Sequence, residues 1–132
     1  MATRRRATFL DLLDRKASLF DDQLHSTLWH DDLQHTNLIF RPGRASWQLA
    51  AVLDWDKAWA GPPESDIARM SFWDDMTGAG FWEVYEAAAP PAEGRFEREL
   101  VYQLLWCFEY PVNTPRHRAD TASVCLRLGV EI

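Results

Sequence analysis

Two apolar segments that each adjoin a carboxylate-bearing loop constrain the fold of this 132-residue chain more than any other feature. Residues 28–37 spell Leu-Trp-His-Asp-Asp-Leu-Gln-His-Thr-Asn, an acidic loop that leads straight into an apolar run. A second apolar run, residues 46–53, is followed at once by Asp54. A carboxylate directly after an apolar strand is hard to explain as part of a solvated face, so a functional role is favoured.

A β-hairpin joins these two segments in our prediction. Residues 37–41 and 46–53 have strand character, and Pro42-Gly43 between them fits the centre of a type II turn, because proline presets φ and glycine accepts positive φ. The hairpin would place Asn37, where the first strand begins, beside Asp54, where its partner ends.

Helical periodicity accounts for most of the remaining chain, so we predict one domain over residues 1–132, of the α+β class with helices dominant. The first helix is expected over residues 8–25. Its apolar stripe would be Leu10, Leu13, Ala17, Phe20 and Leu24, and Arg4-Arg5-Arg6 would form a solvated arm before it. The later helices are expected from Pro63 with Ile67, Met70 and Trp73 inward, over 81–89, from Gly94 to Pro111 with Phe96, Leu100, Leu104 and Phe108 inward, and from Thr114-Pro115 to Leu128 with Gly129 as its stop.

The charge balance excludes some partners. A net charge of −6 and a pI near 5.1 argue against nucleic acid as the main partner. No apolar run approaches the roughly 20 residues that a membrane span needs, so we expect no membrane association. Cys107 and Cys125 have no metal or redox spacing, which favours free, buried thiols and a reducing, cytoplasmic setting.

Three sequence elements, taken in order, resemble one family. The first, H-x-D-x-x-x-x-N, is carried by His30, Asp32 and Asn37, and the second is Leu53-Asp54-Trp55-Asp56. The third, Gly61-Pro62-Pro63-Glu64-Ser65-Asp66-Ile67-Ala68, is similar to G-D-P-x-x-D-L-A, with proline in place of its first Asp. Together they resemble the aminoglycoside phosphotransferase and choline kinase-like family, small-molecule relatives of the protein kinases. The resemblance implies the C-terminal lobe of a protein-kinase-like fold, with the catalytic and metal-binding loops on a small β-hairpin.

The resemblance also implies roles for the polar residues. Asp32 would be the catalytic carboxylate that orients the attacking hydroxyl, and Asn37 and Asp54 would hold Mg²⁺ or Mn²⁺ against the phosphates of ATP. His30 would support the loop from below, and Asp66 would tie the loop down through hydrogen bonds.

Two further carboxylates flank these positions. Asp31 replaces a small residue of the family pattern, and Asp tolerates positive φ better than most residues. Asp56 is either an additional carboxylate beside the metal or a solvent-exposed residue.

Other metal chemistries fit less well. His25, His30 and His35 recur every five residues, a spacing that does not put them on one helical face, and no cysteine lies nearby to complete a zinc site. His30-Asp31 suggests a metal-dependent phosphohydrolase, but His25 is too close to this pair in the sequence.

The nucleotide lobe of the family has no counterpart in these residues. Neither Lys16 nor Lys57 lies on an apolar strand, and no glycine-rich loop precedes the catalytic element. The chain therefore resembles the C-terminal lobe alone, inactive unless a separate nucleotide-lobe chain joins it to act on a small-molecule hydroxyl substrate. The alternative is a catalytically silent remnant that serves as a binding or interaction module.

A lobe without its partner would expose apolar surface. We expect that surface on residues 8–30 and around Trp47, Trp55 and Trp59. It would favour a two-fold homodimer. The N-terminal helix would lie at the centre of this dimer, through Phe9, Leu12 and Leu19.

Overall fold

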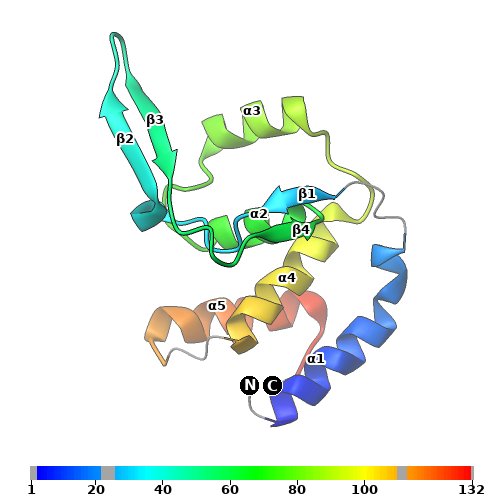
Figure 1. Cartoon of the computed structure of the whole chain (residues 1–132). Coiled ribbons are helices and arrows are strands. Elements are labelled where there is room, and N and C mark those ends of the chain that lie inside the picture. The colour runs from blue at the N-terminus through cyan, green and yellow to red at the C-terminus, as the bar shows by residue number, and fades with distance from the viewer. Residues whose placement is uncertain (1–2, 22–25, 110–112, 132) are drawn as a thin grey trace. The chain divides into compact units, whose positions relative to one another are not determined.

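A computed structural model describes residues 3–21, 26–109 and 113–131 of the chain. The architecture is α+β with helices dominant, as predicted (Figure 1). In chain order the elements are α1 (Thr3–Arg15), the 3-10 helix η1 (Ala17–Phe20), β1 (Thr27–Trp29), the 3-10 helix η2 (His35–Asn37), β2 (Leu38–Pro42), β3 (Trp47–Val52), β4 (Trp59–Gly61), α2 (Glu64–Met70), α3 (Ala79–Ala88), α4 (Arg95–Glu109) and α5 (Pro115–Leu128).

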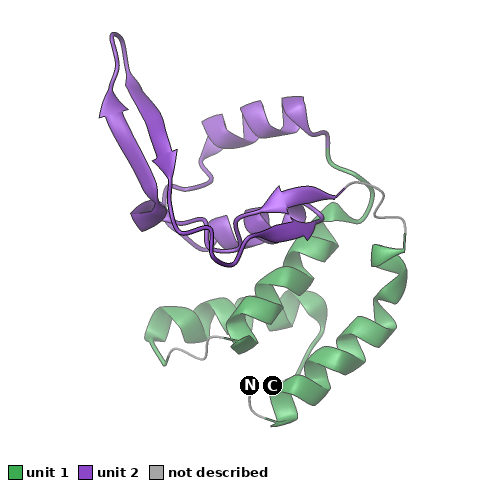
Figure 2. Cartoon of the chain, in the orientation of Figure 1, with its two compact units in different colours: residues 1–24, 91–132 green, residues 25–90 purple. Residues whose placement is uncertain are grey.

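The chain forms two compact units (Figure 2). Unit 1 combines Met1–Leu24 with Pro91–Ile132 and carries α1, η1, α4 and α5. Unit 2, His25–Pro90, carries the described strands together with η2, α2 and α3. The acidic loop and the hairpin therefore belong to the same unit.

Unit 1 is built around α4, which packs against α1, η1 and α5. Its most deeply buried side chains are Leu12 from α1 and Val101, Leu104 and Phe108 from α4. The last helix begins and ends as predicted: Thr114 accepts a hydrogen bond from the His117 N–H, and Gly129 closes the helix at a φ of 64°.

The predicted N-terminal helix is wrong in both its bounds and its buried face. The α-helix begins at Thr3 and ends at Arg15, and η1 replaces its expected continuation; Leu24 lies outside the described residues. Leu12 is 0% exposed, whereas Leu10, a member of the predicted stripe, is 49% exposed.

The reason is a basic residue in the buried stripe. The Arg5 guanidinium lies over the Phe108 ring, 5.7 Å from its centroid, so Arg5, Phe9 and Leu12 form one face at helical spacing. A search for apolar periodicity alone overlooks the stem of an arginine. The predicted solvated arm is therefore wrong at Arg5. Since Phe9 and Leu12 are buried inside unit 1, they are not the centre of a dimer.

The predicted stripe of α4 is wrong at its first turn for the same reason. Phe96 is exposed, while Arg98 is buried and donates to the carbonyls of Leu19 and Glu93. Trp73 is exposed and lies beyond the end of α2, and Pro111, the expected break after α4, lies outside the described residues.

The β2–β3 hairpin is confirmed, but its turn is not type II. Pro42 ends β2 and pairs with Trp47, which leaves a four-residue loop. In that loop the Gly43 N–H donates to the Ser46 carbonyl at 2.9 Å. A Cβ at residue 43 would lie 2.6 Å from the Ser46 oxygen, so the loop requires glycine because of this close approach.

Sequence analysis did not foresee the second strand pair, β1 with β4. It has only three antiparallel pairings, from Thr27 with Gly61 to Trp29 with Trp59. The Trp29 ring lies against Gly61, where a Cβ would come within 2.4 Å of it, and meets the Trp59 ring edge to face at 5.0 Å. Gly61 therefore terminates a strand instead of simply interrupting the chain.

Cys107 and Cys125 are free and buried, as predicted. Among the described residues, no helix combines the length and apolar character needed to cross a membrane.

The buried face of α1 can be tested with two alanine substitutions on opposite sides of the helix, at Leu12 and at Leu10. Leu12→Ala should lower the free energy of unfolding by about 2–5 kcal/mol, because it opens a cavity in a closed core. Leu10→Ala should change it by less than about 0.5 kcal/mol. Urea denaturation followed by circular dichroism measures both. Equal losses for the two variants would contradict the buried face described here.

Candidate functional site

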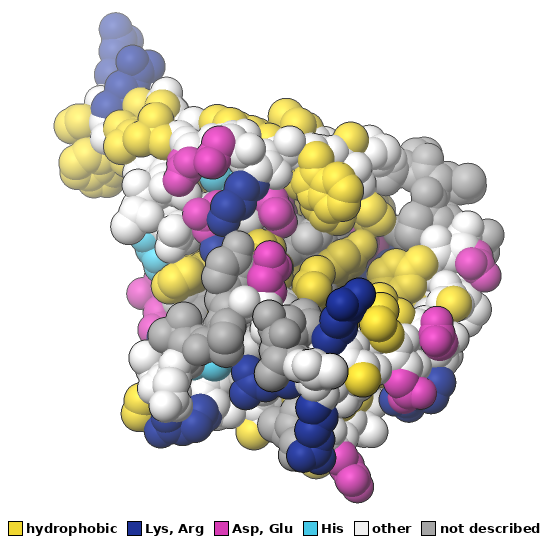
Figure 3. Space-filling model, turned by 60° about the horizontal axis from the view of Figure 1, so that its bottom comes forward, with side chains coloured by type: hydrophobic (Ala, Val, Ile, Leu, Met, Phe, Trp, Pro, Cys, Tyr) yellow, Lys and Arg dark blue, Asp and Glu magenta, His cyan; other side chains and the backbone are white. Residues whose placement is uncertain are grey.

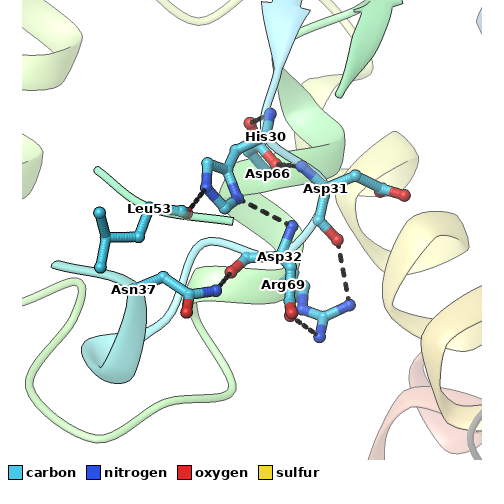
Figure 4. A network of polar contacts seen from close by, with 7 residues as sticks. All are labelled: His30, Asp31, Asp32, Asn37, Leu53, Asp66 and Arg69. Carbon is cyan, nitrogen blue, oxygen red and sulfur yellow. Dashed lines mark hydrogen bonds and ion pairs between the residues drawn. The ribbon is translucent and has the colours of Figure 1, made fainter. Parts of the chain in front are cut away.

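The acidic loop is anchored to α2 by the carboxylate of Asp66. Its Oδ2 accepts the His30 backbone N–H at 2.8 Å, and its Oδ1 accepts the Asp31 N–H at 2.9 Å (Figure 4). Asp66 lies in the first turn of α2, directly after Gly61-Pro62-Pro63 redirects the chain. The start of the loop therefore takes its position from a helix and not from its own flexible backbone.

Asp31 adopts a φ of 63°, the left-handed conformation expected at the position where the family pattern has a small residue. Its side chain points away from Asp32 and Arg69 (Figure 4). Its carbonyl accepts a hydrogen bond from Arg69 Nη1 at 3.2 Å. Asp31 thus shapes the turn that presents Asp32.

Asp32 forms an ion pair with Arg69. Arg69 Nη2 donates to Asp32 Oδ1, and the two side chains are only 14% and 16% exposed. Asp32 Oδ2 accepts no hydrogen bond from the described residues. One oxygen of the carboxylate is therefore fixed while the other is left for a ligand.

Sequence reasoning missed Arg69. A signal was present, because Arg69 follows Asp66 by three residues on one helix, and residues at that spacing face the same side. With Asp66 expected to hold the loop, its helical neighbour was a candidate for the same task.

His30 joins the loop to the end of β3. It is buried, its Nε2 donates to the Leu53 carbonyl at 2.6 Å, and its Nδ1 accepts the Asp32 N–H at 3.2 Å. These two partners assign the proton to Nε2. The imidazole also contacts the Trp55 ring, with 4.6 Å between centroids. Both ring nitrogens are thus occupied within the protein.

Asn37 connects the same two segments from the other side. Its Nδ2 donates to the Asp32 carbonyl at 2.9 Å, and its own carbonyl accepts the Leu53 N–H at 2.8 Å. Because Leu53 immediately precedes Asp54, these bonds bring Asp32, Asn37 and Asp54 together at the base of the hairpin. The Oδ1 of Asn37 accepts no hydrogen bond from the described residues.

Asp54 is exposed and has a φ of 65°. A hydrogen bond with the Asp56 side chain and the negative charge of Asp56 raise the pKa of Asp54 above its ordinary value of 3.8, and the charge of Asp32 adds to this effect. His30 acts in the opposite direction. Asp54 and Asp56 are therefore neighbouring carboxyl groups, within electrostatic reach of Asp32.

The donor set at the hairpin base suits a hard cation. Asn37 and Asp54 offer oxygen ligands, and Mg²⁺ usually takes one or two carboxylates together with waters and substrate phosphates. In the part of the chain that is described, no three His, Cys, Asp or Glu side chains are grouped closely enough to hold a metal ion. His25, one of the histidines considered for zinc, lies outside that part. Asp54 and Asp56 form a close, exposed pair of carboxyl groups and not a complete set of metal ligands.

Comparison with known protein families matches residues 2–100 to the phosphotransferase enzyme family. The matched segment includes the acidic loop, the hairpin and α2. No curated protein and no solved structure matches the chain.

Removing Arg69 should loosen the loop. Arg69→Gln should lower the free energy of unfolding by about 1–3 kcal/mol, because it leaves a mostly buried carboxylate without its charged partner. The matched control is Arg15→Gln, which removes an exposed ion pair with Asp11 and should cost less than about 0.5 kcal/mol. Urea denaturation at neutral pH measures both. A loss for Arg69→Gln no greater than that of the control would show that the pair contributes little.

The raised pKa of Asp54 has a defined consequence for stability. A raised folded-state pKa means that this group's stabilising contribution is complete below the ordinary value of 3.8 and is lost as pH rises through the folded-state pKa. Asp56→Asn removes the neighbouring charge, so the pKa of Asp54 should fall toward its ordinary value and the pH-dependent loss should shrink. A ¹³C NMR titration of the Asp54 carboxyl carbon tests this. An unchanged midpoint in Asp56→Asn would contradict the coupling.

Proposed function

Because this chain belongs to the phosphotransferase enzyme family, we propose that residues 30–56 carry the catalytic and metal-binding loops of a small-molecule phosphotransferase. The proposed reaction transfers the γ-phosphoryl group of ATP to a substrate hydroxyl with Mg²⁺ or Mn²⁺. The observation that carries the proposal is the pair of hydrogen bonds through Asn37, one to Asp32 and one from Leu53. They support a shared site for the catalytic carboxylate and the metal ligands.

Asp32 is the proposed catalytic carboxylate. With its Oδ1 held by Arg69, its Oδ2 can accept a hydrogen bond from the substrate hydroxyl and direct the oxygen lone pair toward the phosphorus atom. Phosphoryl transfer passes through a loose transition state in most analyses, so positioning and charge stabilisation supply most of the catalysis. A carboxylate locked in place by an arginine suits such an orienting role.

Asn37 and Asp54 are the proposed metal ligands. Asn37 Oδ1 and the Asp54 carboxylate would hold the ion, with Asp56 as an additional carboxylate beside it. The ion would neutralise charge on the phosphates of ATP. Its positive charge also offsets the repulsion between the carboxyl groups of Asp54 and Asp56.

The remaining polar residues hold the catalytic carboxylate and the metal ligands in position. Asp66 anchors the backbone of His30 and Asp31, and Arg69 holds Asp32. His30 has both ring nitrogens engaged with Asp32 and Leu53, which supports a structural role and not acid–base work.

The finer fold assignment is also part of the proposal. The order of loop, hairpin and helices supports a protein-kinase-like C-terminal lobe. We place the nucleotide-covering part of the enzyme on a segment or partner outside these 132 residues. In support, the Lys16 ammonium is engaged in an ion pair with Glu97 in unit 1. Use of ATP fits a cytoplasmic enzyme.

Binding of Mn²⁺ tests the metal site without requiring turnover. Millimolar Mn²⁺ should broaden the NMR signals of the Asn37 side-chain amide and the Trp55 indole N–H before other signals, because paramagnetic broadening falls steeply with distance. Asp54→Asn should abolish this selective broadening. Affinity should be weak, since the substrate phosphates are not present to complete the shell.

Asp75→Asn is the matched control. Asp75 is also an exposed aspartate with positive φ, at 64°, and asparagine keeps that backbone conformation at either site. It should leave the broadening unchanged. Broadening that is spread evenly over acidic surface residues, or that survives Asp54→Asn, would count against the phosphotransferase site and favour an interaction module.

A further inference from the structure

The outer part of the β2–β3 hairpin carries apolar side chains on one side. Phe40 pairs with Leu49 and Pro42 pairs with Trp47, and these pairs are two residues apart on both strands, so their four side chains share a side. Arg41 and Gln48, which pair between them, lie on the opposite side. We call the first set, Phe40, Pro42, Trp47 and Leu49, the hairpin face.

The hairpin face is open to solvent. Trp47 is 69% exposed, Leu49 54% and Phe40 51%. Alternation of apolar and polar residues is typical of antiparallel strands that bury one side, and an isolated two-stranded hairpin is at best marginally stable in water. A covering partner would therefore stabilise this hairpin.

The two ends of the hairpin carry opposite charge. Arg44 lies in the exposed connecting loop, and Arg41 is exposed in the strand beside it. Asp54 and Asp56 are exposed just beyond the other end of β3. Figure 3 shows basic side chains at the outer end of the hairpin, upper left, with hydrophobic side chains next to them.

We propose that the hairpin face binds the same face of a second copy of this chain, with the two hairpins antiparallel. A two-fold axis matches the apolar sets with each other. The antiparallel arrangement also places the basic tip of each hairpin at the acidic base of the other, so both ends are complementary. A parallel arrangement would instead bring like charges together.

The area available sets the strength of this dimer. Aromatic side chains bury about 150–250 Å² each, so Trp47 at 69% exposure, Phe40 at 51% and Leu49 at 54% supply roughly 300–400 Å² per copy. A standard interface buries roughly 800 Å² per partner. The pair should therefore be weak, with association visible at micromolar to sub-millimolar concentration.

Sedimentation velocity across that concentration range provides the test. Wild-type protein should shift from monomer to dimer as concentration rises, and Trp47→Thr should weaken the dimer by roughly tenfold or more. Gln48→Thr is the matched control on the opposite side of the same strand and should associate like wild type. A wild-type monomer throughout would overturn the proposal and leave the face to another occupant. A dimer that survives Trp47→Thr would also overturn it.

A charge exchange tests the antiparallel arrangement and does not depend on Trp47→Thr folding well. Arg44→Glu alone and Asp56→Lys alone should each weaken association, since each places like charges at both ends. An equal mixture of the two variants should restore it, because every end then pairs opposite charges. A mixture no more associated than either variant alone would overturn the tip-to-base arrangement.

Discussion

The geometry of the site depends on one carboxylate, that of Asp66, which accepts the backbone N–H groups of two consecutive loop residues. A loop without regular secondary structure must find hydrogen-bond acceptors for its backbone N–H groups. Here the acceptor is Asp66 on α2, the short helix that follows Pro62 and Pro63. With the N–H groups of His30 and Asp31 held, the chain turns through a positive φ at Asp31. That turn brings the Asp32 carboxylate to Arg69 and its carbonyl to Asn37.

The aspartates of the site serve backbone geometry as well as charge. Asp31 and Asp54 both adopt a positive φ, which costs a non-glycine residue about 1–3 kcal/mol and persists only where surrounding contacts enforce it. Here those contacts are the hydrogen bonds that Asp66 accepts from the loop N–H groups, and the bonds of Leu53, which accepts from His30 and donates to the Asn37 carbonyl. Glycine would relieve the strain at Asp54 but would remove its carboxylate. Aspartate at position 54 thus combines a carboxylate with a positive φ that few other charged residues adopt readily.

Motif spacing was enough to predict the family, the hairpin and the gathering of Asp32, Asn37 and Asp54, because the loop and both strands are close in sequence. The buried faces of α1 and α4 were not predictable from apolar periodicity, since Arg5 and Arg98 occupy core-facing positions. The β1–β4 pair was missed because three pairings leave almost no alternation to detect. Arg69 was missed because its partner is set by the fold of the loop, which a local motif does not describe.

The hairpin connects the site to the proposed interface. Strand β3 carries Trp47 and Leu49 on the hairpin face and ends where Leu53 is held by His30 and Asn37. A two-stranded ribbon has little stability of its own, so contacts that order either end favour the same paired strands. A second copy bound to the hairpin face and a cation at the base of the hairpin would then both favour the conformation in which β2 and β3 are paired. A cation would also neutralise the Asp54 and Asp56 carboxylates that meet the basic tip of the second copy, so charge opposes this shared preference, and by linkage each binding event changes the affinity of the other by the same factor.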